Sequence, residues 1–275
     1  MSYDFSTGFG LVKRCEDEDI SISELMIRRE TEMGEQTRDE VIADMRRSLK
    51  VMRDSIHKGL TSKVQSVSRL TGGEAMTLYR YNLKLSQEMF TLISCFEVSL
   101  RNRINKEMVA NFGNDWLRDF ILPGGRFDTD PRVDGTRKII KKAYEGLIRS
   151  HNYSHTKLLA EMEFGVWKFM FNNVQYRIAN RCLLNIFPNK PTSTAQHQYD
   201  NTFVFNDLNV INTIRNRIAH HEAICFGNPV SIDTQGVLDC YARIMRLFHW
   251  MNINANTLLY GLDHVGQVSS RIMCI

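Results

Sequence analysis

The stretch that decides the fold is residues 78–108, LYRYNLKLSQEMFTLISCFEVSLRNRINKEM. Its apolar residues recur at spacings of three, four or seven, which places them on one face of an α-helix: Leu78, Leu85, Met89, Leu92, Phe96, Leu100, Ile104 and Met108. Because Thr71-Gly72-Gly73 is a turn signal, we expect a helix over residues 73–111. This length, well above the roughly 12 residues usual in globular proteins, predicts a central helix on which others pack.

The composition is that of an ordinary globular protein. The chain has 275 residues, 43% of them hydrophobic and 24% charged, with only 5 Pro and 16 Gly. So few helix breakers favour an all-α fold. We expect an N-terminal extension over residues 1–73, a loose arm followed by amphipathic helices within residues 21–58. The main helical domain is expected over residues 74–262, followed by a C-terminal tail over residues 263–275.

Further helices are expected after the central one. Residues 137–150 predict a basic helix, whose charges we interpret as a solvated face in preference to an RNA-facing one. Residues 156–187 are predicted to be helical and rich in aromatic side chains, with an interruption at Gly165. Asp207 is expected to cap a helix that continues to about Phe226, where Gly227-Asn228-Pro229 stops it. A last helix is expected over residues 231–259.

Nothing in the sequence predicts a metal, a cofactor or a membrane span. The six cysteines are scattered, with no Cys-x-x-Cys pair, and we interpret them as reduced thiols. The N-terminus has no basic region leading into an apolar stretch, and no run of about 18 apolar residues could cross a bilayer. We therefore expect a cytoplasmic protein. The formal net charge of +4 permits RNA binding without requiring it.

A repeated pentapeptide holds the candidate chemistry. The pattern apolar-Arg-Asn-Arg-Ile occurs at residues 100–104 and again at residues 214–218, and only the second copy continues into Ala219-His220-His221-Glu222. A guanidinium offers a bidentate fork for a phosphate, and an imidazole ordinarily titrates near neutral pH. Together they can grip a phosphate diester and move protons on it. The second copy is therefore the candidate site.

The helical period predicts how these side chains lie. On an ideal helix Asn216 and His220, four residues apart, fall on the side opposite the apolar stripe of Ile211, Ile214 and Ile218. We expect the Asn216 and His220 side chains to meet there. On spacing alone, a simple solvent-exposed histidine pair is the commoner interpretation of this pattern.

Several short motifs of the sequence resemble those of a known family. Residues 215–222 are similar to the Arg-Asn-x-x-x-His signature of HEPN-superfamily ribonucleases, and their setting resembles the Abi-like (abortive infection) family of bacterial proteins. Residues 79–82 (Tyr-x-x-Asn) and 97–102 (Glu-x-x-Leu-Arg-Asn) are similar to that family's first long helix, and residues 161–165 (Glu-x-Glu-Phe-Gly) to its middle helix. The resemblance covers about residues 74–262. Met162-Glu163 and Ala223 depart from the usual pattern, which affects local packing but not the Arg, Asn or His.

The resemblance implies an HEPN-like helical bundle and a homodimer whose two Arg-Asn-x-x-x-His helices share one composite cleft. It also implies a metal-independent endoribonuclease, in which a 2'-hydroxyl attacks the adjacent phosphorus and leaves a 2',3'-cyclic phosphate. His220 would act as general base or acid, and Arg215 would stabilise the charge on the phosphate oxygens. Asn216 would orient His220 or the phosphate. His221 is the secondary candidate.

Five residues are expected to support this site: Glu97, Arg101, Asn102, Arg217 and Glu222. Glu97 and Arg101 would form an intrahelical pair that either positions the catalytic helix or serves packing alone. Arg217 would contact the RNA backbone or be solvated. The alternative function is a non-catalytic dimer of the same type that binds RNA or protein. The family resemblance further implies antiphage defence, or a toxin held silent by a partner RNA or protein.

Overall fold

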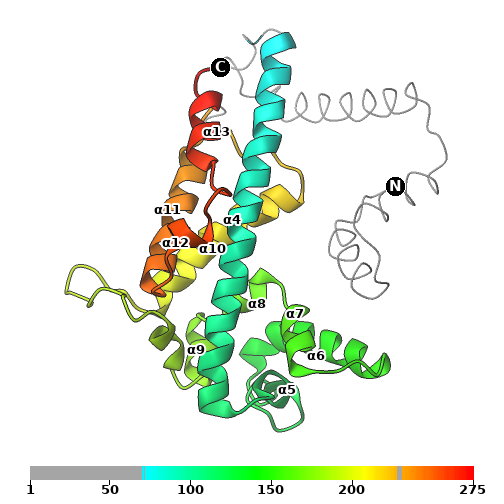
Figure 1. The fold of residues 1–275 in the computed structure, drawn as a ribbon. Helices are drawn as coiled ribbons and strands as arrows, with labels where there is room; N and C mark the ends of the chain where they lie inside the picture. The colour runs from blue at the N-terminus through cyan, green and yellow to red at the C-terminus, as the bar shows by residue number, and fades with distance from the viewer. Residues whose placement is uncertain (1–69, 71, 228–230) are drawn as a thin grey trace, which may run out of the picture. The chain divides into compact units, whose positions relative to one another are not determined.

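The computed structural model describes residues 70, 72–227 and 231–275 (Figure 1). The amphipathic helices expected within residues 21–58 lie outside the described residues. The part of the chain that is described is all-α, as expected, and contains no strand beyond one isolated bridge between Phe226 and Ile232.

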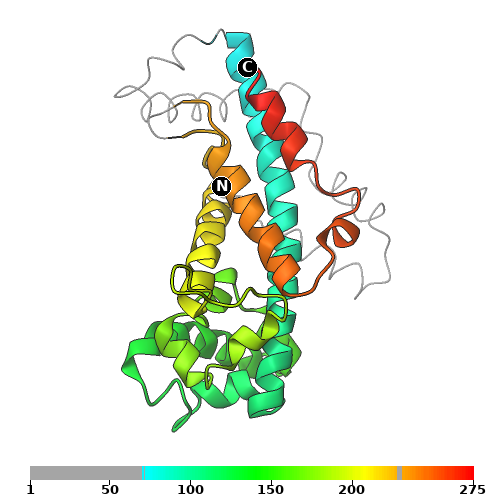
Figure 2. The same cartoon turned by 90° about the vertical axis from the view of Figure 1, so that its left-hand side faces the viewer.

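The central helix is α4, Gly72–Phe112, which confirms the helix expected over residues 73–111. Its apolar stripe is the buried face: Leu85, Met89, Phe96, Leu100, Ile104 and Met108 are completely inaccessible to solvent. Helices α10 (Asn201–Ala219), α11 (Gln235–Trp250) and α13 (Val265–Ile272) pack along one part of α4. Figure 2 shows these four side by side, with the helices formed by residues 116–178 gathered at the other end of α4. Phe96 of α4 contacts both groups of helices. Its ring centroid lies 5.3 Å from that of Phe248 in α11 and 6.3 Å from that of Phe164.

The region expected to be helical over residues 156–187 is divided more often than the sequence predicted. It forms α7 (His155–Ala160), α8 (Phe164–Phe169), α9 (Asn173–Ile178) and the 3-10 helix η3 (Cys182–Ile186). Gly165 lies inside the first turn of α8, so it is not the point of interruption. Before α9, the Asn172 side chain caps the helix by accepting from the Val174 N–H, and after α9 Asn180 and Arg181 adopt a left-handed backbone conformation. These breaks need neither glycine nor proline, which is why the sequence did not indicate them.

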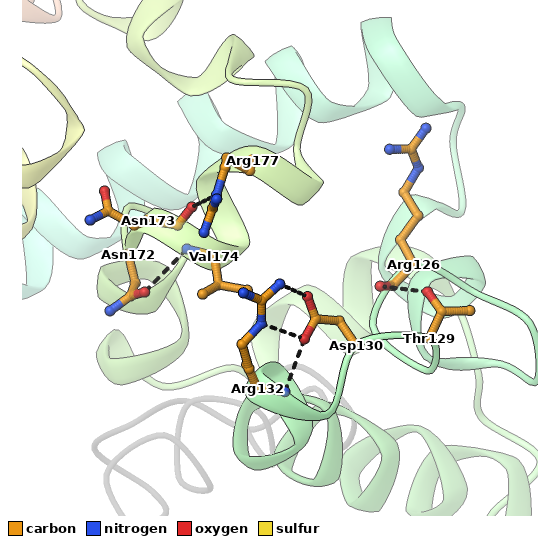
Figure 3. A network of polar contacts seen from close by, with 8 residues as sticks. All are labelled: Arg126, Thr129, Asp130, Arg132, Asn172, Asn173, Val174 and Arg177. Carbon is orange, nitrogen blue, oxygen red and sulfur yellow. Dashed lines mark hydrogen bonds and ion pairs between the residues drawn. The ribbon is translucent and has the colours of Figure 1, made fainter.

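A loop over residues 122–130 joins α5 (Trp116–Ile121) to the 3-10 helix η2 (Pro131–Val133) and α6 (Asp134–Arg149). Asp130 organises its end (Figure 3). The Asp130 carboxylate accepts from the Arg132 backbone N–H at 3.0 Å and from the Arg132 guanidinium at 2.9 and 2.6 Å. These hydrogen bonds lower the pKa of Asp130 to about 2. Helix α6 matches the basic helix expected over residues 137–150.

Two more of the predicted helix bounds were wrong. Helix α10 begins at Asn201, where Asp200 is the cap and accepts from the Phe203 N–H at 2.9 Å. Asp207 instead lies inside the helix, buried, and pairs with Arg243 and Arg246 of α11, the latter at 2.5 Å. The last expected helix, residues 231–259, is divided into α11 and α12 (Ala255–Leu258), with α13 following them.

Candidate functional site

The carboxyl end of α10 carries the candidate residues. The helix ends at Ala219, not at Phe226 as expected, and the chain leaves it through two backbone hydrogen bonds. The His221 N–H donates to the Ile218 carbonyl (3.0 Å), and the Glu222 N–H donates to the Arg217 carbonyl (2.8 Å). This pair of bonds is the Schellman motif, which needs a left-handed residue, usually glycine, just after the helix. His221 takes that conformation here, with φ of 57°.

His220 therefore lies at the helix cap, as the first residue after α10. It is joined to Asn216 through the backbone, since the His220 N–H donates to the Asn216 carbonyl at 2.9 Å. The Asn216 side-chain oxygen instead lies 3.5 Å from a terminal nitrogen of Arg215. The predicted meeting of the Asn216 and His220 side chains is not formed within the described residues, where the His220 ring has no hydrogen-bond partner. Both His220 and His221 are exposed.

Arg215 of α10 shares its surroundings with Glu97 and Arg101 of α4. All three are partly buried. Burial raises the pKa of the Glu97 carboxyl above its ordinary value; the positive charges of Arg215 and then of Arg101 oppose that rise, and Glu163 adds to it. Charges influence one another in this way only over short distances. The fold thus brings Arg101 of the first pentapeptide, and Glu97 one turn before it, close to Arg215 of the second pentapeptide within one chain.

Other predicted residues fall into two groups. Arg217 lies near Glu222, with 3.7 Å between its Nε and a carboxylate oxygen, and it also donates to the Ala223 carbonyl. These two residues therefore hold the chain that follows the histidines. Asn102 is exposed on α4, and no hydrogen bond or ion pair in the described part of the chain links it to the others. The structure therefore does not link Asn102 to Arg215, Glu97 or Arg101.

Part of the chain matches a known protein family. The family model of the Abi-like proteins matches residues 62–225, more than half of the chain. The chain belongs to the Abi-like protein family. The match includes α4, α8 and α10, and it ends at Cys225, just beyond the two histidines.

A partial similarity to another protein was also found. A stretch of 71 residues is 37% identical to the probable L-serine dehydratase, alpha chain, of Bacillus subtilis (strain 168). It covers 26% of this chain and 23% of the dehydratase, so the chain spans about a quarter of the length of that relative. No solved structure matches significantly.

Asn82 is a residue of the Abi-like protein that our sequence reasoning left without a role. It is 7% exposed on α4, and its side-chain oxygen accepts from the Ile224 backbone N–H at 2.9 Å. The bond ties the segment that follows the histidines to the central helix, across 142 residues of sequence. A signal existed, because Asn82 lies within the apolar stripe between Leu78 and Leu85, where a polar side chain needs a partner.

The described residues of the Abi-like protein hold no group of three or more His, Cys, Asp or Glu placed to bind a metal ion. The cysteines among them are all free: Cys95, Cys182, Cys225, Cys240 and Cys274. Burial raises the pKa of the Cys225 thiol to about 11 and that of Cys240 to about 12, which keeps both protonated at neutral pH. None of the described helices combines the length and the apolar character that crossing a bilayer requires.

Proposed function

We propose that this Abi-like protein is a metal-independent endoribonuclease of the HEPN type, acting in the cytoplasm in antiphage defence by abortive infection or as a toxin. The observation that carries the proposal is the arrangement at the end of α10. Arg215 is half-buried near Glu97, Arg101 and Asn216, whereas His220 and His221, five and six residues further along the chain, are exposed. A held guanidinium beside accessible imidazoles is suited to an RNA phosphodiester.

The reaction needs only groups of the protein and of the RNA. A histidine removes the proton from a 2'-hydroxyl, and the oxygen attacks the adjacent phosphorus. The bond from phosphorus to the 5'-oxygen breaks, and that oxygen receives a proton from a second group. The products are a 2',3'-cyclic phosphate and a 5'-hydroxyl. Arg215 donates hydrogen bonds to the non-bridging oxygens, where negative charge builds.

Two proton-carrying groups are required on opposite sides of the phosphate, and this requirement supports a homodimer. His220 of one chain would serve as base and His220 of a second copy as acid, in a cleft that the two α10 ends share. The exposure of His220 and its lack of a hydrogen-bond partner among the described residues are consistent with a site that a second copy completes. His221 is the alternative second group.

The test is cleavage by the purified full chain in excess chelator, with structured and unstructured RNA. We expect the wild type to cut and to leave cyclic phosphate ends, identified by mass spectrometry. His220→Ala should slow cutting by about two to four orders of magnitude, and Arg215→Ala by about two to three. Matched controls are His249→Ala, an exposed histidine of α11, and Arg149→Ala, an exposed arginine of α6, both of which should cut like wild type. Equal cutting by all five proteins would remove these residues from the site.

One observation favours the second candidate, a dimer that binds RNA or protein without cutting it. The Asn216 side chain faces Arg215 and leaves His220 without an orienting partner in the described part of the chain. Such a module would bind RNA with a salt-dependent affinity and yield no new ends under any condition.

A further inference from the structure

The outward face of α10 continues well beyond the candidate site. Asn216, Asn212, Asn209 and Phe205 are separated by four, three and four residues, so they lie on one side of the helix. All four are exposed or partly exposed. At 1.5 Å per residue they extend over ~16 Å. The only carboxylate in α10, Asp207, is buried against α11, so this face carries amides and no negative charge.

Helix α8 lies antiparallel beside this face. Glu163, the residue that precedes α8, and Arg215, near the end of α10, both act electrostatically on Glu97. Towards the other end of α8, the Lys168 ammonium donates to the Asn209 side-chain oxygen at 3.1 Å, and the ring of Phe169 lies 6.1 Å from that of Phe205 (centroids). Lys168 and Phe169 therefore flank the half of the face that is remote from the histidines.

Lys168 has an unusual environment for a cation. The residue is 8% exposed, and its ammonium lies 4.5 Å from the centre of the Phe169 ring and 5.6 Å from that of Phe205. Burial lowers its pKa, and no carboxylate in the described residues pairs with it. Buried charges are ordinarily paired. Asn209, which accepts the hydrogen bond from the ammonium, is exposed, so the ammonium lies just beneath the surface, within reach of an external anion that could supply the missing charge.

We propose that this face, formed by Phe205, Asn209, Asn212 and Asn216 of α10 with Lys168 and Phe169 of α8, binds a single-stranded segment of RNA next to the cleaved bond. The identity of the partner rests on the proposed function. Lys168 contacts a phosphate, the Phe169 ring stacks on a base, and the amides bond to base edges or sugar hydroxyls. A self-association surface would present a more apolar centre than this row of amides.

The experiment measures binding separately from cutting. The probe is a fluorescent, unstructured oligoribonucleotide, and the parent protein is the full chain carrying His220→Ala, which leaves the probe intact. Lys168→Met keeps a long apolar side chain beside the Phe169 and Phe205 rings and removes the charge. Phe169→Ala removes a ring that is already 38% exposed, so it tests the face without depending on a buried residue. The control is Lys142→Met, an exposed lysine of α6 with no ion pair in the described part of the chain.

We expect Lys168→Met to weaken binding several-fold and to reduce the slope of log affinity against log salt by about one. Phe169→Ala should weaken binding at least about fivefold, and Lys142→Met should change neither quantity. Circular dichroism melting checks that each variant is folded. The proposal is overturned if the parent binds no oligoribonucleotide, or if both variants bind as the parent does.

Light scattering separates the competing partner. If the variants lose self-association while RNA affinity is unchanged, the face contacts a second copy and not RNA. The proposed nuclease is judged by a different result: a wild type that cuts no RNA, with weakened binding in both variants, would reject the nuclease and keep the RNA-binding face. A wild type that cuts RNA, together with variants whose RNA affinity is unchanged, would keep the nuclease and reject the RNA-binding face.

Discussion

Glu97 of α4 and Arg215 of α10 are electrostatic neighbours within one chain, 118 residues apart in sequence and brought together by the packing of the two helices. Burial raises the pKa of the Glu97 carboxyl, and the Arg215 guanidinium is the strongest influence against that rise. The carboxyl thus faces the one guanidinium that we assign to the phosphate. The two charges interact within one chain, without a contribution from a second copy.

Glu97→Gln should change the pH dependence of stability. Because the pKa of Glu97 in the folded state lies above its ordinary value of 4.5, its contribution to stability is full below that value and is lost as pH rises through the folded pKa. The wild type should therefore lose stability relative to Glu97→Gln over that range, and the difference should then level off. Melting temperatures of both proteins between about pH 4 and 8 measure this.

Glu161→Gln is the matched control, since Glu161, the residue that follows α7, is exposed. Its difference from wild type should stay flat across the same range. A Glu97→Gln difference that is equally flat would mean that the carboxyl titrates normally and that its burial has no energetic consequence.

His221→Gly separates backbone strain from chemistry. A left-handed conformation is unfavourable for histidine and free for glycine, so the variant should gain about 0.5–1 kcal/mol of stability. His151 supplies a matched control, because it ends α6 in the same motif: its φ is 53°, its N–H donates to the Ile148 carbonyl and the Asn152 N–H to that of Leu147. His151→Gly should gain a similar amount in urea denaturation.

The same two variants test which histidine carries the proton. If His220 does, both should cut RNA at the wild-type rate. A loss of about a hundredfold or more in His221→Gly alone would assign proton transfer to His221, and would reverse the ranking of the two histidines.

The periodic parts of the fold were predictable from sequence, and the boundaries set by distant contacts were not. Helix α4 follows its prediction to within one residue at each end because its apolar repeat is long and begins after a turn signal. The end of α10 could not be predicted, since His221 performs the turn that glycine usually marks. Asp207 has the residue type of a cap, but Arg243 and Arg246, which pair with it, lie more than 30 residues away.

The candidate site divides in the same way. The sequence singled out Arg215, Asn216, His220 and His221 and named Glu97 and Arg101 as their support, because short motifs carry that information. It could not indicate that the Asn216 side chain would face Arg215 instead of His220, since residue spacing does not determine which neighbour a side chain contacts. Nor could it assign Asn82, whose partner Ile224 is 142 residues away.

Asp207→Ala should destabilise the protein by about 2–3 kcal/mol. The change removes a buried carboxylate and leaves Arg243 and Arg246 without their counter-charge at the contact between α10 and α11. The loss is moderated because both arginine side chains are about one-third exposed and keep some contact with water. Asp239→Ala, an exposed position of α11, should change stability by less than about 0.5 kcal/mol in the same urea titration. A small loss in Asp207→Ala would show that the pair contributes little.

Asn82→Leu should loosen the segment that carries the histidines. Ile224 is 2% exposed, so the variant leaves its N–H buried without a partner, at a cost of about 1–3 kcal/mol. Asn82→Asp keeps an oxygen that can accept from this N–H and should recover part of the loss. Asn82 touches neither Arg215 nor His220 in any described contact. Any effect of the substitution on cleavage would therefore come from a displacement of the histidines.

Kinetics below the melting temperature of each variant, where all are folded, distinguish a role of Asn82 in positioning the histidines from a role in folding alone. A positioning role predicts a lower kcat for Asn82→Leu with little change in KM, and recovery of kcat in Asn82→Asp, because the displaced histidines act on the chemical step and not on RNA capture. Equal kcat in wild type and Asn82→Leu, despite the loss of stability, would restrict Asn82 to folding. In that case the Schellman turn and the Arg217 bond to Ala223 would suffice to hold His220 and His221 in place.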